Sequence, residues 1–155
     1  MKLYFMRHGM AVNVAGAGAD AERPLTEQGR RQVAAVIDRR EAVLGDLEMI
    51  ITSPYLRTRQ TAGIVSERLN FQGELLVCDE LTPDSNITVL AGLLNKLNPV
   101  AALLVTHQPF IGNVLSALVG DSQLRAIEPA WLVALETEAI SPGYADLAWL
   151  QMPGS

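Results

Sequence analysis

The sequence predicts an α/β protein, a three-layer sandwich with a mostly parallel central sheet, helices on both faces and an antiparallel edge near the C-terminus. Short apolar runs typical of buried strands alternate with segments that repeat apolar residues at helical spacing. Over residues 131–137 and 145–151, apolar and polar residues alternate instead, as in an antiparallel hairpin at a sheet edge. We expect residues 1–155 to form a single domain.

Four buried strands are expected from the apolar runs. The first is aromatic and ends before a pair of basic residues, and the fourth is the most apolar segment of the chain. The four predicted strands are residues 2–6, 48–52, 75–78 and 100–106.

Helix start signals follow each of these strands. After a polar, glycine-containing loop over residues 10–24, the first helix is expected to start near Thr26 and to carry Val33, Val36 and Ile37 on one face. Ser53 and Pro54 supply a cap and a first-turn proline for a helix that runs to about Leu69.

The second half of the chain repeats this pattern. Asn86 can cap a third helix with Leu90, Leu93, Leu94 and Leu97 facing inward. A fourth helix is expected after Pro109, ending near Leu118.

The composition indicates a well-packed globular protein. Hydrophobic residues make up 49% of the chain and charged residues 19%, which argues against disorder. The net charge of −5 disfavours a nucleic-acid partner. Lys96, Asn98 and Pro99 divide the longest candidate for a membrane span, so no membrane association is expected. A single cysteine, Cys78, and the absence of a signal-peptide pattern predict a cytoplasmic protein, which we expect to be a monomer.

Polar side chains gather where the predicted strands end. Arg7, His8 and Gly9 follow the first strand, and the chain's second histidine, His107, follows the fourth. Arg57 lies one turn into the helix after the second strand, and Glu80 follows the third. Strands that alternate with helices are usually parallel, so these residues share the carboxyl edge of the sheet, where α/β proteins bind ligands.

Two arginines and two histidines at one edge point to phosphate chemistry. The arginine fork matches phosphate oxygens, and a neutral imidazole is a competent nucleophile. A metal site is the weaker interpretation, because the two histidines are far apart and lack the spacing of ligand motifs. Residues 16–21 match a dinucleotide-binding pattern but neither follow a strand nor open a helix, so we interpret them as a mobile loop bordering the site.

Four motifs in sequence order resemble the histidine phosphatase (phosphoglycerate-mutase-like) superfamily. They are Arg7-His8-Gly9, Leu25-Thr26-x-x-Gly29, Ser53-Pro54-x-x-Arg57-x-x-Gln60-Thr61-Ala62, and Thr106-His107 after an apolar strand. The short chain, Asp20-x-x-Arg23-Pro24-Leu25-Thr26 and Glu80-Leu81-Thr82-Pro83 are similar to its SixA-type phosphohistidine phosphatase branch.

The resemblance implies a role for each matching residue. His8 would be the nucleophile that accepts the phosphoryl group, and Arg7, Arg57 and His107 would bind its oxygens. Gly9 would allow close backbone approach beside the nucleophile, and Arg23 would add a substrate contact or lie in solvent at the helix entry. The protonation of His107 stays open.

The proton donor is the role for which the match is loose. Larger members carry a carboxylate acid in a segment that this chain is too short to hold. Glu80 is the candidate acid, and a loop carboxylate without a catalytic role is the alternative.

The resemblance implies a protein phosphohistidine phosphatase that acts on a histidine-phosphorylated carrier domain of a phosphorelay without cofactor or metal. A small-molecule phosphomonoesterase or mutase is the alternative, and a phosphate-binding module without activity is a third class. The intact set of four site residues disfavours the third class. The short chain, with little room for a lid, disfavours the second.

Overall fold

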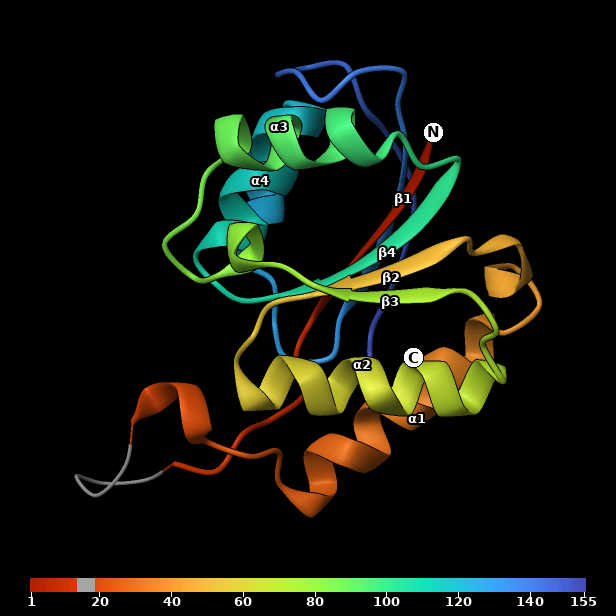
Figure 1. Cartoon of the computed structure of the whole chain (residues 1–155), viewed down its shortest axis with the longest axis vertical. Coiled ribbons are helices and arrows are strands. Elements are labelled where there is room, and N and C mark those ends of the chain that lie inside the picture. The colour runs from red at the N-terminus through yellow and green to blue at the C-terminus, as the bar shows by residue number, and fades with distance from the viewer. Residues whose placement is uncertain (14–18) are drawn as a thin grey trace.

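A computed structural model describes residues 1–13 and 19–155 of the chain. The central sheet has six strands in the order β3-β2-β4-β1-β5-β6 (Figure 1). The strands are β1 (Lys2–Arg7), β2 (Met49–Thr52), β3 (Glu74–Val77), β4 (Ala101–Thr106), β5 (Leu132–Glu136) and β6 (Asp146–Gln151). Strands β1 to β4 run parallel, whereas β5 and β6 pair antiparallel at one edge. The predicted fold class and the antiparallel C-terminal edge are confirmed.

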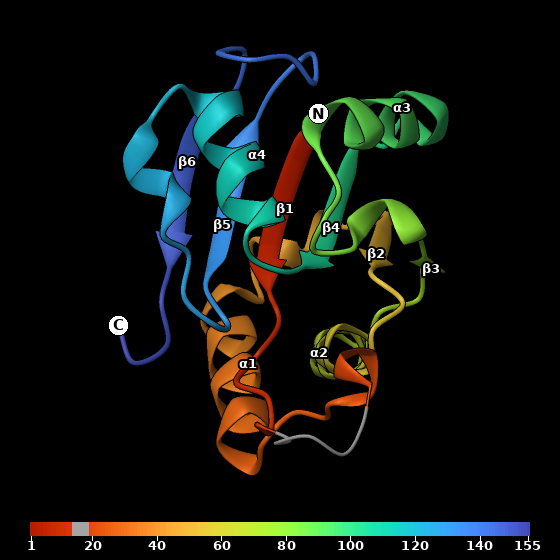
Figure 2. The same cartoon turned by 90° about the vertical axis from the view of Figure 1, so that its left-hand side faces the viewer.

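Two helices cover each face of the sheet. Helices α1 (Glu27–Arg40) and α2 (Leu56–Leu69) lie on one face, and α3 (Ile87–Leu97) and α4 (Phe110–Val119) lie on the other (Figures 1 and 2). Alternation along β1 produces this division, because Tyr4 and Met6 pack toward α1 and α2 while Leu3 and Phe5 pack toward α3 and α4. All four side chains are buried.

Most predicted helix starts are correct, and their caps explain why. Thr26 Oγ1 accepts a hydrogen bond from the Gly29 backbone N–H at 2.9 Å, and Asn86 Oδ1 accepts one from Val89 at 3.0 Å. Each bond satisfies a backbone donor that the first helical turn leaves free.

The start of α2 differs from the prediction. The helix begins at Leu56, with Tyr55 as its N-cap residue, so Pro54 lies before the first turn rather than within it. The Ser53 backbone N–H still donates to the Val105 carbonyl at 3.1 Å, which extends the pairing with β4 by one residue. Ser53 therefore belongs to the end of the strand, and its side chain turns toward the candidate site.

The loop after β1 is held against the first turn of α1. A Cβ atom added to Gly29 would lie 2.3 Å from the Met10 carbonyl oxygen, so this close approach requires glycine. Residues 16–18 of the predicted mobile loop, including Gly16 and Gly18, lie outside the described residues, whereas its last two residues open a short 3₁₀ helix, Asp20–Glu22. No helix in the described part of the chain is long and apolar enough to cross a membrane.

Candidate functional site

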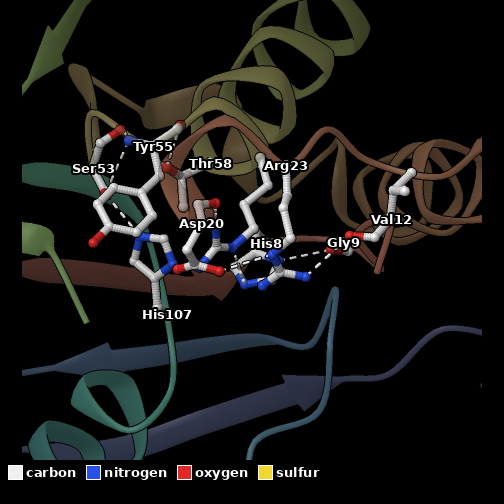
Figure 3. Close-up of polar contacts among 10 residues, drawn as sticks. His8, Gly9, Val12, Asp20, Arg23, Ser53, Tyr55, Thr58 and His107 are labelled. Carbon is white, nitrogen blue, oxygen red and sulfur yellow. Dashed lines mark hydrogen bonds and ion pairs between the residues drawn. The ribbon is translucent and has the colours of Figure 1, made fainter. Parts of the chain in front are cut away.

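The carboxyl ends of β1 and β4 place the two histidines side by side. The His8 backbone N–H donates to the Thr106 carbonyl at 3.1 Å, so each histidine is the first residue beyond its strand. Their ring centroids are 5.3 Å apart in an edge-to-face arrangement (Figure 3). The structure thus brings together the two histidines that the sequence placed at one edge.

The hydrogen bonds of His8 fix its tautomer. Its Nδ1 lies 2.7 Å from the carbonyl oxygen of Gly9, and Arg57 Nε donates to its Nε2 at 3.2 Å. A carbonyl can only accept and a guanidinium can only donate. Nδ1 therefore carries the proton, and the electron pair of the unprotonated Nε2 accepts the hydrogen bond from Arg57.

Arg57 is almost fully buried, and a carboxylate covers its outer edge. Its Nη1 donates to the Asp20 carbonyl at 2.8 Å, and its Nη2 donates to Asp20 Oδ2 at 3.1 Å. Asp20 also accepts a hydrogen bond from Arg23 Nε at 2.8 Å. Arg23 thus reaches the site through Asp20, which bridges the two arginines.

His107 is buried between aromatic and polar neighbours. Its Nε2 lies 2.7 Å from Ser53 Oγ, and its ring meets the ring of Tyr55 edge-on at 4.7 Å between centroids. The Arg57 guanidinium also lies over the Tyr55 ring, with its Cζ atom 4.9 Å from the ring centroid. His107 Nδ1 has no hydrogen-bond partner among the described residues.

Arg7 enters the site from the end of β1. Its Nη1 donates to the Ile127 carbonyl at 2.8 Å, whereas its buried Nε has no partner in the described part of the chain. Burial lowers the pKa of Arg7, with Arg57 acting in the same direction and Glu128 opposing it. Among the described residues, Nη1 is the one guanidinium nitrogen of Arg7 that makes a hydrogen bond. The remaining N–H groups of Arg7 therefore stay available near Arg57 and His8.

Burial keeps both histidines neutral. Desolvation, with smaller contributions from Arg57 and Arg7, lowers the pKa of His8 to about 4. Desolvation and the neighbouring His8 and Arg57 lower the pKa of His107 to about 2. We therefore expect His107 to be an uncharged imidazole near neutral pH in the free protein.

Burial tends to raise the pKa of Asp20, but hydrogen bonds and positive charge from Arg23 and Arg57 outweigh that tendency and lower it. Asp20 is consequently an anion in the resting site, where its carboxylate contacts the donors that an entering oxyanion would use. The carboxylate stays accessible, with 61% of the side chain exposed.

The motif residues around Arg57 hold the loop and the strand end in place. Thr61 Oγ1 accepts from the Gly9 backbone N–H at 3.2 Å and donates to the Arg57 carbonyl at 2.8 Å. Gln60 Oε1 accepts from Leu25 N–H at 2.8 Å. A Cβ atom on Gly9 would lie 2.8 Å from the Gly29 carbonyl oxygen, so the close approach at Gly9 is made by α1.

Glu80 lies in a short 3₁₀ helix, Asp79–Leu81, after β3. The Leu81 carbonyl accepts a hydrogen bond from Thr106 Oγ1 at 2.6 Å, which ties this turn to the end of β4. Among the described residues, no hydrogen bond or ion pair joins the Glu80 side chain to the histidines or to Arg57. Its role as an acid stays a prediction.

Three contributors to the site have no role in it that the sequence predicts. In the sequence, Asp20 belongs to a motif without an assigned role, Ser53 is predicted to cap a helix, and Tyr55 carries no predicted role. Their types and positions carry no signal of contact with Arg57 or His107, because those contacts span different elements. Within the described ranges, no group of three or more His, Cys, Asp or Glu side chains is arranged to hold a metal ion.

Because both histidines are neutral in the folded protein, we expect the free energy of unfolding to decrease as the pH falls from 6.5 toward 4. In this window the unfolded chain binds a proton on each histidine, whereas the folded site leaves both largely neutral. Each histidine is expected to lower the free energy of unfolding by up to about 1.4 kcal/mol per pH unit. Urea denaturation across this pH range measures the slope. The variant His107→Gln should show about half of it, and a flat wild-type profile would contradict neutral burial.

Because the Asp20 carboxylate occupies donors of Arg57, we expect it to weaken the binding of an oxyanion at the site. In Asp20→Asn, the negative charge beside Arg57 is lost, so tungstate should bind roughly 3- to 10-fold more tightly at low salt. Isothermal titration calorimetry measures the dissociation constant. Asp38→Asn is the matched control, because Asp38 pairs with Arg68 on the exposed surfaces of α1 and α2. Weaker tungstate binding by Asp20→Asn would show that Asp20 orients Arg57 and does not compete with the anion.

Comparisons with known proteins show what this chain is similar to. The histidine phosphatase superfamily (branch 1) matches residues 3–82. Phosphohistidine phosphatase SixA of Escherichia coli is 29% identical over 121 residues, covering 76% of this chain and 74% of that protein. An uncharacterized protein of Picosynechococcus sp. is 36% identical over 121 residues, covering 76% and 73% of the two chains. A solved structure of the protein histidine phosphatase SixA complexed with tungstate has a TM-score of 0.86 at 25% identity and covers 99% of this chain and 97% of its own.

The family match and the site geometry support each other. The matched residues include Arg7, His8 and Arg57, and the β1–β4 pairing adds His107, which lies beyond the matched range. The chain belongs to branch 1 of the histidine phosphatase superfamily.

Proposed function

We propose that the protein is a protein phosphohistidine phosphatase that dephosphorylates a histidine-phosphorylated carrier domain through a covalent phospho-His8 intermediate. The observation that carries the proposal is the unprotonated Nε2 of His8, which Arg57 and the Gly9 carbonyl hold in the nucleophilic tautomer. The relatives named phosphohistidine phosphatases add support, since one of them aligns with three quarters of this chain.

The first chemical step transfers the phosphoryl group to His8. A bond forms between phosphorus and His8 Nε2, and the bond between phosphorus and the substrate nitrogen breaks. Arg7, Arg57 and His107 provide donors for the three equatorial oxygens, an electrostatic contribution of the kind that dominates phosphoryl transfer. A substrate imidazole protonated on its other nitrogen leaves as a neutral ring and needs little help from a protein acid.

The second step is hydrolysis of phospho-His8. Water attacks phosphorus, the bond to Nε2 breaks, and its electron pair returns to the imidazole. Both protons of the water leave on the oxygens of the phosphate product, while the Nδ1 proton stays on the ring and keeps its hydrogen bond to the Gly9 carbonyl. Inorganic phosphate leaves past Arg57. Asp20 can then return to the guanidinium edge that it contacts in the resting site.

A protein substrate is favoured by the exposed surroundings of the site. Asp20 reaches solvent, and the same loop exposes the apolar side chains of Met10 and Val12, each 37% exposed. These side chains would contact a folded partner that carries the phosphohistidine. We propose the cytoplasm as the compartment, where the single cysteine, Cys78, stays reduced.

Turnover through His8 predicts a trapped phosphoenzyme. Rapid-quench experiments with a ³²P-labelled phosphohistidine carrier should label the wild type with acid-labile, base-stable phosphate. His8→Ala should fold, since the residue lies beyond the carboxyl end of β1 and outside the hydrophobic core, and it should show neither label nor turnover. Arg57→Ala should keep the nucleophile but lose about 2–4 kcal/mol of transition-state stabilisation. Undiminished turnover in His8→Ala would contradict the proposal.

The alternative, a small-molecule phosphomonoesterase or mutase, predicts a different dependence on Glu80. An alkyl phosphate ester has a poor leaving group and needs a proton donor, whereas phosphohistidine does not. Glu80→Gln should therefore leave kcat/KM for phosphohistidine nearly unchanged and strongly lower it for an alkyl ester, if Glu80 is the acid. The exposed neighbour Asp79→Asn is the matched control. A higher kcat/KM for a sugar phosphate than for every phosphohistidine carrier offered would favour the alternative.

A further inference from the structure

We propose that Ser53 is a positioning residue that fixes His107 as the Nδ1–H tautomer, so that a neutral N–H donor faces the entering phosphoryl oxygens. The inference deepens the proposed function, on which its catalytic meaning rests. The two ring nitrogens of His107 have different surroundings. Nε2 lies 2.7 Å from Ser53 Oγ, whereas the buried Nδ1 has no hydrogen-bond partner among the described residues.

The backbone of Ser53 holds its hydroxyl in place. Its N–H donates to the Val105 carbonyl at 3.1 Å, and its carbonyl accepts hydrogen bonds from Thr52 Oγ1 and Thr58 Oγ1, both at 3.0 Å. The residue is fully buried. Ser53 is therefore anchored at the end of β2. It lies beside Val105 of β4, two positions before His107.

The hydroxyl has one proton, and His107 is the acceptor in position for it. Ser53 Oγ already accepts a hydrogen bond from the Tyr55 backbone N–H at 3.3 Å. The remaining contact of the hydroxyl within the described residues is with His107 Nε2. If Ser53 donates there, Nε2 is unprotonated, and the single proton of the neutral ring resides on Nδ1.

The Nδ1–H tautomer of His107 also leaves fewer buried polar groups without a hydrogen-bond partner. With the proton on Nδ1, one buried group of the pair lacks a partner, the Nδ1–H itself. With the proton on Nε2, both the Ser53 hydroxyl proton and the Nδ1 electron pair would be buried without partners. Each unsatisfied buried group is unfavourable, so the Nδ1–H tautomer is the more stable one.

The unpartnered atom is directed at the site. Figure 3 shows the Nδ1 side of the His107 ring facing Asp20 and His8, while the opposite nitrogen faces Ser53. A donor there would bind an oxyanion, whereas an electron pair would repel it. Because burial keeps His107 uncharged in the free protein, the choice of tautomer decides between attraction and repulsion.

The experiment reads the tautomer directly, since the chain has two histidines. In ¹⁵N-histidine-labelled protein, long-range ¹H–¹⁵N correlation distinguishes protonated from unprotonated ring nitrogens, and His8→Gln assigns the remaining signals to His107. We expect a protonated Nδ1 in the wild type and a shift toward protonated Nε2 in Ser53→Ala. Tungstate should bind Ser53→Ala about tenfold more weakly, as for the loss of one hydrogen bond to an anion.

Ser116→Ala is the matched control, because Ser116 is a buried serine on α4 whose hydroxyl donates to the Asn113 carbonyl. It should change neither the tautomer nor tungstate binding. A wild-type His107 protonated on Nε2 would overturn the inference, even if Ser53→Ala failed to fold. So would an unchanged tautomer and unchanged tungstate affinity in folded Ser53→Ala. If these results were as expected while no phosphohistidine carrier was hydrolysed, the proposed function would fail and the role of Ser53 would stand.

Discussion

The candidate site depends on two backbone hydrogen bonds that extend the parallel pairing of β4 by one residue on each side. On one side the His8 N–H donates to Thr106, and on the other the Ser53 N–H donates to Val105, both at 3.1 Å. They fix the spacing of three polar side chains that come from distant parts of the chain. The β1–β4 register also sets their direction, because His8 and His107 follow Met6 and Val105, which pack toward α1 and α2. A slip of one residue would turn the nucleophile to the opposite face.

Exclusion of water gives the histidines their chemistry. A solvated imidazole would be partly protonated near neutral pH, whereas burial of His8 and His107 keeps both in the neutral form. Neutrality alone does not make a nucleophile, because either ring nitrogen could hold the proton. At His8 the Gly9 carbonyl and Arg57 settle this choice from opposite sides of the ring. Burial and fixed partners therefore act together.

The positive charge of the site is balanced in the resting protein by Asp20. Arg57 is buried, and an isolated buried cation is costly. The carboxylate and carbonyl of Asp20 satisfy its outer donors, and Arg23 holds Asp20 from the other side. The Asp20 side chain is nevertheless 61% exposed, so the charge that balances Arg57 lies at the solvent side of the site.

The order of elements, the class of fold and the gathering of Arg7, His8, Arg57 and His107 at the carboxyl ends of the strands can be predicted from the sequence. These follow from local signals: apolar runs, caps at Thr26 and Asn86, and residues that directly succeed strands. Local signals suffice there because parallel strands joined by helices place their carboxyl ends together whatever the details of packing.

The hydrogen-bond partners and the protonation of those residues depend on contacts between distant parts of the chain. Ser53 looks like a helix cap in sequence, yet β2 continues through its backbone and its hydroxyl meets a histidine 54 positions away. Asp20 meets Arg57 across 37 positions. Which donor finds which acceptor over such separations depends on strand register and helix packing. The tautomer of a buried histidine depends in turn on that neighbour and on the exclusion of water, neither of which is encoded in a local pattern.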